Sequence, residues 1–240
     1  MLFRSRGLPQ DYEKAATWFL RAAEQGNADA QWYTGQLYYR GEGVLKDLMK
    51  ARLWFERCVD LEHAECFSTL GEIYWFGHGI PVNFEKAKNL FIAGAKRGDG
   101  WADWALGQMH ISGDGVPQSN TKGLNYFARG AQRGALLSIM ALGKAFRDGV
   151  IVGKDNVRAL QWFRIAAEKG DEDAATEASE IEKLLNPDQI EQAKRLQDDW
   201  KRLRADSFWP FDFEILEEFN FDVAAFEKKV GIDQIGRAHV

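Results

Sequence analysis

The chain has 240 residues, of which 45% are hydrophobic and 28% charged, and its formal net charge is −5. This composition is typical of a globular protein. No apolar run approaches the roughly 20 residues that span a bilayer, so the sequence predicts no membrane span. The fold must be inferred from the order of the residues.

Several residue types recur every 36 positions along the chain. Each repeated phenylalanine follows a large residue, and a basic residue stands five positions before it. A strict period between 20 and 50 residues predicts a solenoid of stacked repeats. The repeated positions include Phe19, Phe55, Phe91, Phe127 and Phe163, and the glycines Gly35, Gly71, Gly107 and Gly143.

Each repeat has the features of two helices joined by a short turn. In the first repeat we expect helices at about 11–25 and 29–40, with Asp11 placed to cap the first one. Gly26 and Gly41 follow the two helices, where a residue with positive φ is favoured. The sequence therefore predicts an all-α fold of five tandem repeats, at residues 11–46, 47–82, 83–118, 119–154 and 155–190, the last one degenerate.

The combined pattern resembles a known family. K-A-x-x-W-F-x-x-A-A-x-x-G-x-x-x-A, followed by G-x-x-Y-x-x-G-x-G-V-P-Q-D, is similar to the Sel-one-like repeat, an αα repeat related to the tetratricopeptide repeat. The resemblance covers about residues 1–190 and implies a right-handed superhelix of αα-hairpins that binds other proteins as a scaffold or adaptor. Two repeats depart from the pattern, because Ile151 replaces a loop glycine and Ser179 replaces the glycine of the second helix.

The ends of the chain differ from the repeats. Residues 1–10 align with the end of a repeat, so we expect them to be the tail of a truncated repeat in a protein that extends further upstream. Residues 191–205 resemble the capping helix of such arrays, beginning near Pro187. Residues 234–240, QIGRAHV, match a translated sequencing adapter, and we interpret them as an artefact.

The segment between them, residues 206–233, is acidic and aromatic. It holds seven aromatic residues, eight acidic residues and two basic ones, which gives a net charge of −6. So many aromatic rings favour burial. The segment is therefore expected either to fold back onto the solenoid or to dock on a partner.

Cys58 and Cys66 are the only cysteines. Both occupy small-residue positions where the two helices of a repeat meet, so they should face each other. His63 lies between them, but the sequence shows no fourth ligand nearby, so we predict no metal and no cofactor. The same C-x7-C pair marks cysteine-rich members of the family that the sequence resembles, where it bridges the two helices. That resemblance implies a disulfide, although two buried thiols remain the alternative.

The redox state of this pair bears on the compartment. A disulfide over about nine residues would add about 2–3 kcal/mol of stability. A bridged pair favours the periplasm or the extracellular space, and free thiols favour the cytoplasm.

The sequence shows no catalytic constellation. Ser119-Asn-Thr-Lys122 spells S-x-x-K, but Lys122 is the repeat lysine and no K-T-G or S-D-N motif accompanies it. His78 and His110 each lack a nearby nucleophile or acid. We therefore predict a protein without enzymatic activity; the alternative is a cell-envelope accessory protein with weak, β-lactamase-like processing of a ligand.

Residues 1–205 carry no net charge, which argues against nucleic acid as a partner.

A partner surface is predicted on the second helices, which align with the groove-lining helices of tetratricopeptide repeats. Four tryptophans stand there at positions that the repeat does not require, whereas Trp18, Trp54 and Trp162 stand where every repeat has a large residue and should be buried. Aromatic residues and arginine are the usual anchors of interfaces. We predict a monomer that binds a peptide or helix of a partner, unless these rings pack between repeats or under the tail. The predicted groove consists of Trp32, Gln36, Tyr39, Ser68, Glu72, Trp75, Trp101, Trp104, Gln108, Ile111, Met140, Lys144 and Arg147.

Overall fold

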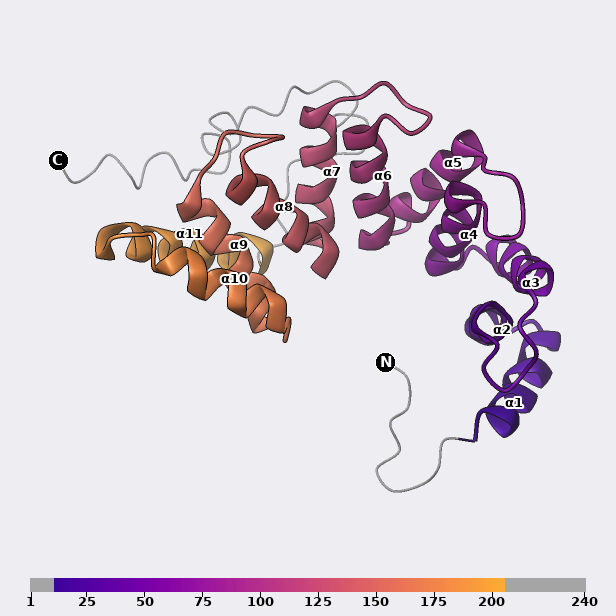
Figure 1. Cartoon of the computed structure of the whole chain (residues 1–240). Helices are drawn as coiled ribbons and strands as arrows, with labels where there is room; N and C mark the ends of the chain where they lie inside the picture. Colours follow the sequence, from indigo (N-terminus) through magenta and orange to yellow (C-terminus); the bar gives the residue numbers. More distant parts are fainter. Residues whose placement is uncertain (1–10, 206–240) are drawn as a thin grey trace. The chain divides into compact units, whose positions relative to one another are not determined.

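The computed structural model describes residues 11–205, and all elements in that range are helices (Figure 1). The expectations for residues 1–10, 206–233 and 234–240 lie outside the described residues. The first helices of the repeats are α1 (Tyr12–Glu24), α3 (Leu48–Asp60), α5 (Phe84–Lys96), α7 (Asn120–Gln132) and α9 (Asn156–Glu168). The second helices are α2 (Ala28–Arg40), α4 (Ala64–Phe76), α6 (Gly100–Ser112), α8 (Leu136–Asp148) and α10 (Glu172–Glu182), and α11 (Pro187–Ala205) follows them. Both series begin every 36 residues, so the predicted all-α hairpin fold is confirmed.

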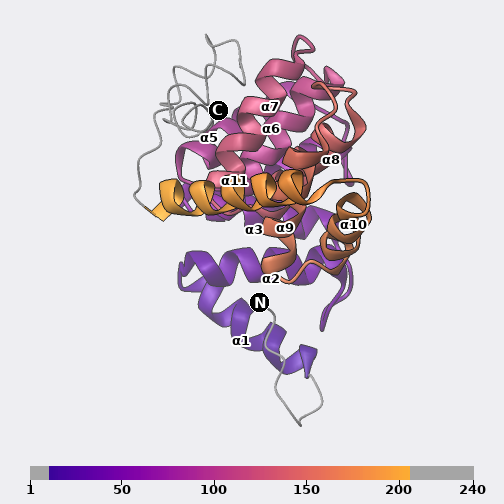
Figure 2. The same ribbon diagram turned by 90° about the vertical axis from the view of Figure 1, so that its left-hand side faces the viewer.

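The chain divides into two compact units, Met1–Gly98 and Asp99–Val240, which are described separately. In the first unit, each of the helices α1 to α4 packs against the next one along the chain. In the second unit, α9 contacts α8, α10 and α11. Figure 2 shows α11 as the long orange helix beside α9. Within residues 11–205, no helix combines the length and apolarity needed to cross a bilayer.

Side-chain caps fix where the first helices begin. The residue before each first helix accepts a hydrogen bond from a backbone amide in the first turn, as Asp11 does from Lys14 at 3.0 Å. Such caps satisfy amides that have no partner within the helix. Ser119 has this role before α7, where its hydroxyl accepts from the Lys122 amide at 3.3 Å. The serine of the S-x-x-K motif is thus engaged in capping a helix.

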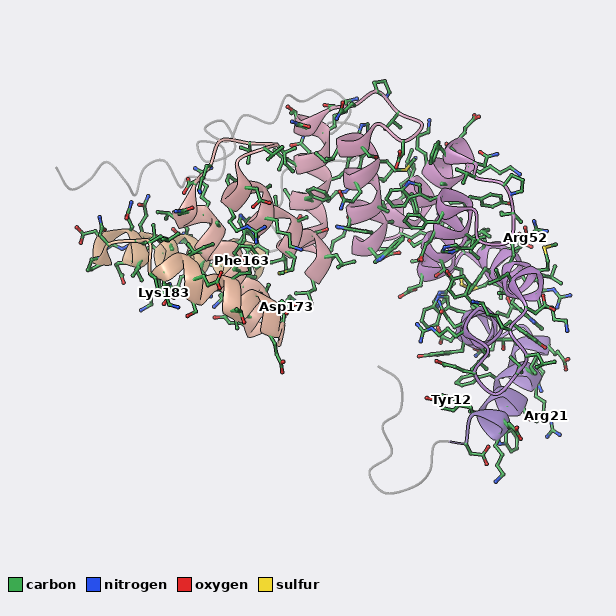
Figure 3. The ribbon with its side chains drawn as sticks, viewed as in Figure 1. Tyr12, Arg21, Arg52, Phe163, Asp173 and Lys183 are labelled. Atoms are coloured by element: carbon green, nitrogen blue, oxygen red, sulfur yellow. A yellow bond between two sulfur atoms is a disulfide. The ribbon has the colours of Figure 1, made fainter. Side chains whose placement is uncertain are left out.

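A glycine and a phenylalanine form the repeated core contact. A Cβ atom added to Gly35 would lie 2.5 Å from the ring of Phe55, which belongs to the next repeat. Gly107 and Phe127 are related in the same way, also at 2.5 Å. Only glycine lets the second helix approach so closely, and the ring that fills the space is fully buried. Figure 3 contrasts Phe163, inside the second unit, with Asp173 and Lys183, which face solvent.

The large residue before each phenylalanine is not always buried. Trp54 and Trp162 are each 8% exposed, as predicted, but the prediction is wrong for Trp18, which is 67% exposed. Trp54 packs against Ala23 and Ala30 of the preceding repeat. No described helix precedes α1, so Trp18 has no such neighbour. The guanidinium of Arg21 lies over its ring, 5.4 Å from the ring centroid.

Candidate functional site

The helices α2 and α4 bring polar and aromatic side chains together in the first unit. Trp32, Gln36 and Tyr39 lie at i, i+4 and i+7 on α2, which places them on one side of that helix. The indole Nε1 of Trp32 donates to Thr69 Oγ1 on α4 at 3.2 Å. The Tyr39 hydroxyl lies 2.5 Å from Nδ1 of His78, just beyond α4. We call this surface the first aromatic face; it comprises Trp32, Gln36, Tyr39, Glu72, Phe76 and His78.

Glu72 is a half-buried carboxyl group within this face. Burial raises the pKa of Glu72, and the neighbouring His78 and Arg40 act against that rise. Burial also raises the pKa of Tyr39, an effect that Glu72 increases and Arg40 opposes. The carboxylate of Glu72 has therefore lost part of its hydration. A cation from a partner would restore favourable interactions to it.

The predicted groove residues Trp75 and Ser68 are buried. Trp75 is 7% exposed, and its ring lies edge-on to Phe91 with ring centroids 5.6 Å apart. Ser68 is 4% exposed. We therefore leave both residues out of the first aromatic face.

Phe76 is a surface residue that the sequence analysis missed. It is 52% exposed, and its ring stacks on His78 with centroids 5.7 Å apart. The sequence did contain a clue, because the same position holds Arg40, Ser112 and Asp148 in other repeats. A phenylalanine at a position that is otherwise polar marks an exposed apolar side chain.

The helices α6 and α8 form a second surface, in the second unit. The rings of Trp101 and Trp104 lie 5.5 Å apart on α6, and α6 contacts α8 directly. Trp104, Ile111 and Met140 are partly buried and pack against the core of this unit. We call this surface the second aromatic face; it comprises Trp101, Trp104, Gln108, Met140, Lys144 and Arg147.

The two cations of the second aromatic face differ in their surroundings. Lys144 is exposed. Arg147 donates through Nε to Asp148 Oδ1 at 2.6 Å and through Nη1 to Glu177. The Asp148 and Glu177 carboxylates raise the pKa of Arg147. Arg147 is thus held in place by its own carboxylates, and Lys144 is better placed to meet an acidic group of a partner.

The turn between α3 and α4, together with the helix ends on either side of it, spans residues 58–66 and is called the cysteine turn below. A disulfide joins Cys58 and Cys66, whose Cα atoms are 5.8 Å apart and whose side chains are fully buried. Glu62 within this turn has a φ of +60°, a conformation for which other repeats use glycine.

His63 connects the cysteine turn to two carboxylates. Its Nε2 lies 2.6 Å from Asp29 Oδ1, and its Nδ1 lies 3.1 Å from Glu65 Oε2. Nδ1 is also 3.8 Å from Cys66 Sγ. The contact between His63 and Asp29 was not predicted from the sequence, because Asp29 precedes His63 by 34 residues and belongs to another repeat.

The repeats match one family model in five segments, at residues 1–27, 28–63, 70–99, 102–134 and 137–171. That model describes the Sel1 repeat. The chain belongs to the Sel1 repeat family. Sel1 repeats generally mediate protein–protein interactions, and Sel1 repeat proteins are typically non-catalytic scaffolds. Among proteins with curated descriptions, none matches this Sel1 repeat chain significantly.

Solved structures resemble this Sel1 repeat protein over most of its length. A protective antigen present in uropathogenic Escherichia coli strains, which displays an SLR fold, is 28% identical with a TM-score of 0.68. That match covers 81% of this chain but only 42% of the antigen, so the chain spans about two fifths of its relative. A Sel1 repeat protein from Oxalobacter formigenes is 28% identical with a TM-score of 0.66, and the match covers 78% of each chain. The immunity protein PA5088 from Pseudomonas aeruginosa shares the fold at 17% identity and a TM-score of 0.56, over 91% of this chain and 84% of that one.

Proposed function

We propose that this Sel1 repeat protein is a non-enzymatic scaffold or adaptor that binds a peptide or helix of a partner protein through its aromatic faces. The observation that carries the proposal is the first aromatic face. Trp32, Tyr39 and Phe76 gather there around a polar centre, and Phe76 replaces a residue that is polar in other repeats. Burial of such a ring against a partner contributes favourably to the binding free energy.

The charge within the first aromatic face indicates the chemistry of the partner. Glu72 is half-buried and its pKa is raised, so its carboxylate is incompletely solvated in the unbound protein. A lysine or arginine from a partner would pair with it, and an apolar side chain of the same segment would cover Phe76. We therefore expect a partner segment that carries an apolar residue next to a basic one.

The roles of the reactive side chains support a function without catalysis. His78 contacts Tyr39 through Nδ1, and Ser119 caps α7. Both side chains thus have a structural partner in the described part of the chain. The alternative, weak processing of a β-lactam-like ligand, predicts slow hydrolysis of a chromogenic cephalosporin by the pure protein, and Ser119→Ala would abolish that hydrolysis.

The test of the proposed function is partner capture with the full chain as bait. The variant Trp32→Ala/Tyr39→Ala/Phe76→Ala should retain less than about one tenth of each captured partner, because hot-spot aromatic residues dominate interface free energy. Trp18→Ala is the matched control, since Trp18 is also an exposed aromatic residue but lies on α1, outside the first aromatic face.

A second variant keeps the test valid if the triple variant does not fold. Phe76→Ser introduces the residue that Ser112 supplies in another repeat, at an exposed site. It should fold with unchanged helicity and bind each partner more weakly. Equal capture by the wild type and both variants would refute the first aromatic face as the binding surface.

We further propose that the disulfide-bonded protein works in the periplasm or outside the cell, because such compartments maintain disulfides. The test is to count free thiols by mass after equilibration in glutathione buffers from about −180 to −320 mV. A bridge that persists below about −300 mV supports this location. Free thiols at that potential would favour the cytoplasm instead.

A further inference from the structure

We propose that the cysteine turn becomes a zinc site when its disulfide is reduced, a role that goes beyond partner binding. The ligands are Cys58 Sγ, Cys66 Sγ and His63 Nδ1, with a Glu65 carboxylate oxygen as the fourth. The first three atoms lie within 4.8 Å of one another. Two thiolates, an imidazole and a carboxylate are ligand types that Zn²⁺ accepts in a tetrahedral site.

Two spacings around His63 Nδ1 are close to those of a tetrahedral zinc site. With metal–ligand bonds of about 2.0–2.3 Å, neighbouring ligand atoms lie roughly 3.3–3.8 Å apart. Nδ1 of His63 is 3.8 Å from Cys66 Sγ and 3.1 Å from Glu65 Oε2. Cleavage of the S–S bond lets the two sulfurs separate to about 3.8 Å, the distance between two thiolates that share a zinc ion.

His63 itself is unusual among the residues that precede the second helices. Asn27, Asp99 and Asp171 stand at the same repeat position and cap their helices, whereas Ala135 and His63 make no capping hydrogen bond, and of these two only His63 has a polar side chain. Its ring points instead at Asp29, Glu65 and Cys66. The histidine is therefore better explained by what its ring contacts than by the start of α4.

Asp29 completes the arrangement from the neighbouring repeat. In the zinc-bound protein, Nδ1 of His63 would bind the ion, and Nε2 would donate its proton to Asp29 Oδ1, which lies 2.6 Å away. Zinc-binding histidines usually donate their other ring nitrogen to a carboxylate in this way, which fixes the tautomer and the ring orientation. The contact needed in the outer shell of a zinc site is thus already present.

The route to the site is through His63 and Glu65. Both cysteines are fully buried, whereas the side chains of His63 and Glu65 are 22% and 59% exposed. An ion can therefore bind the exposed pair first and the sulfurs afterwards.

The chemistry exchanges one cross-link for another. A dithiol reductant gives two electrons and two protons to the disulfide, so that the S–S bond breaks, two cysteine thiols form and the reductant becomes a disulfide. Zn²⁺ then displaces the two thiol protons into water and binds both thiolates. In the reverse direction, glutathione disulfide takes two electrons from the thiolates, leaves as two glutathione thiolates, and Zn²⁺ is released as the Cys58–Cys66 bond forms. Cys58 and Cys66 are thus joined by a disulfide under oxidising conditions and by a zinc ion under reducing conditions.

The test titrates Co²⁺, a spectroscopic substitute for Zn²⁺, into the full chain reduced by a phosphine that does not bind metal. We expect one equivalent to bind, with thiolate-to-metal charge-transfer absorption and the intense visible bands of a tetrahedral site, and Zn²⁺ should displace it. Addition of glutathione disulfide to the zinc-loaded protein should release one Zn²⁺ per disulfide formed, detected with a chromogenic chelator.

Matched variants use residues that other repeats carry at the same positions. Cys58→Ala/Cys66→Ser copies Ala22 and Ser138 and should lose the charge-transfer absorption. His63→Asn copies Asn27, restores a cap to α4 and should weaken zinc binding by at least tenfold without loss of helicity. Asp29→Asn should weaken it about 10- to 100-fold, as changes in the outer shell do.

Three results would overturn the proposal. One is a reduced protein that binds Co²⁺ no better than the double cysteine variant. Another is a six-coordinate spectrum without thiolate absorption. The last is equal zinc affinity of the reduced and oxidised proteins, which would assign the ion to surface carboxylates.

Discussion

Glu62 adopts a backbone conformation that disfavours side chains. Its φ is +60°, and four other repeats place Gly26, Gly98, Gly134 and Gly170 at the same position. A non-glycine residue in the left-handed region costs roughly 1–2 kcal/mol. Glu62 also pairs with Arg97 at 3.1 Å, but Glu62 is 77% exposed, so this ion pair contributes little.

We therefore expect Glu62→Gly to raise the free energy of unfolding by about 1 kcal/mol. The measurement is urea denaturation of the full chain with the disulfide intact. Gly98→Ala is the reciprocal control, since it places a side chain at φ +93° and should destabilise the protein. Equal midpoints for Glu62→Gly and the wild type would show that the cysteine turn tolerates this conformation without cost.

Glu72 provides a prediction about pH. Its pKa is raised by burial, so the folded protein binds this proton more tightly than the unfolded chain does. Stability from this group is therefore greatest below the unfolded pKa of about 4.3 and is lost as the pH rises through the folded pKa. Glu72→Gln should be more stable than the wild type at pH 7, and the advantage should shrink as the pH falls toward 4. Thermal unfolding of both proteins at several pH values measures this difference in stability. A stability advantage of Glu72→Gln that grows as the pH falls would contradict the prediction.

At the scale of the helix, the glycine–phenylalanine contact is the element that joins one repeat to the next. A methyl group on Gly107 would lie 2.5 Å from the buried ring of Phe127, so one of the two helices must move. Ser179 stands at the glycine position of the last repeat, and α11 follows it in place of another repeat with its phenylalanine.

Gly107→Ala should accordingly destabilise the protein by about 1–3 kcal/mol, the usual cost of an overpacked core. Ser179→Ala is the matched control because it alters the same repeat position where no phenylalanine faces it, and it should change stability by less than about 0.5 kcal/mol. Denaturation of the two variants under the same conditions measures the change in the free energy of unfolding. Similar changes for both variants would mean that the glycine is not required for the contact between repeats.

The periodic sequence was sufficient to predict the helices, because each helix depends on local caps, glycines and a repeated apolar pattern. Exposure was harder to predict, since it depends on what lies next to a residue in space. Trp18 and Trp54 occupy the same repeat position, yet a preceding repeat covers Trp54, whereas no helix within residues 11–205 precedes that of Trp18. Trp75 and Phe76 are adjacent in sequence, but Trp75 is buried and Phe76 is exposed.

Polar contacts between helices were not predictable from spacing alone. Asp103 is fully buried on α6 and is paired with Arg129 on α7 and with Arg133, which directly follows α7. Other repeats place Gln31, Phe67 and Ile139 at this position, so the repeat pattern gives no warning of a buried charge. His63 differs, because a histidine where other repeats have Asn27 or Asp99 as caps was a departure visible in the sequence.

At the scale of the whole molecule, the consequence of a repeat architecture is that a local cross-link has a local effect. In the first unit, α3 contacts α2 and α4, and α4 contacts α3 and α5. Stability in a solenoid is a sum of single repeats and their nearest-neighbour interfaces. Loss of the Cys58–Cys66 bond should therefore weaken its own repeat first and reach other repeats only through those interfaces.

Hydrogen exchange of the full chain, reduced and kept free of metal by a chelator, tests this expectation. Removal of a cross-link over about nine residues should cost about 2–3 kcal/mol. Amides of α3 and α4 should then exchange about 30- to 150-fold faster, while those of α7 and α9 should keep their protection. Cys58→Ala/Cys66→Ser should reproduce the same pattern without any reductant, which separates the lost bond from other effects of the reagent. Uniform loss of protection along residues 11–205 would instead mean that the repeats unfold as one cooperative body, and the cysteine turn would then control the stability of both aromatic faces together.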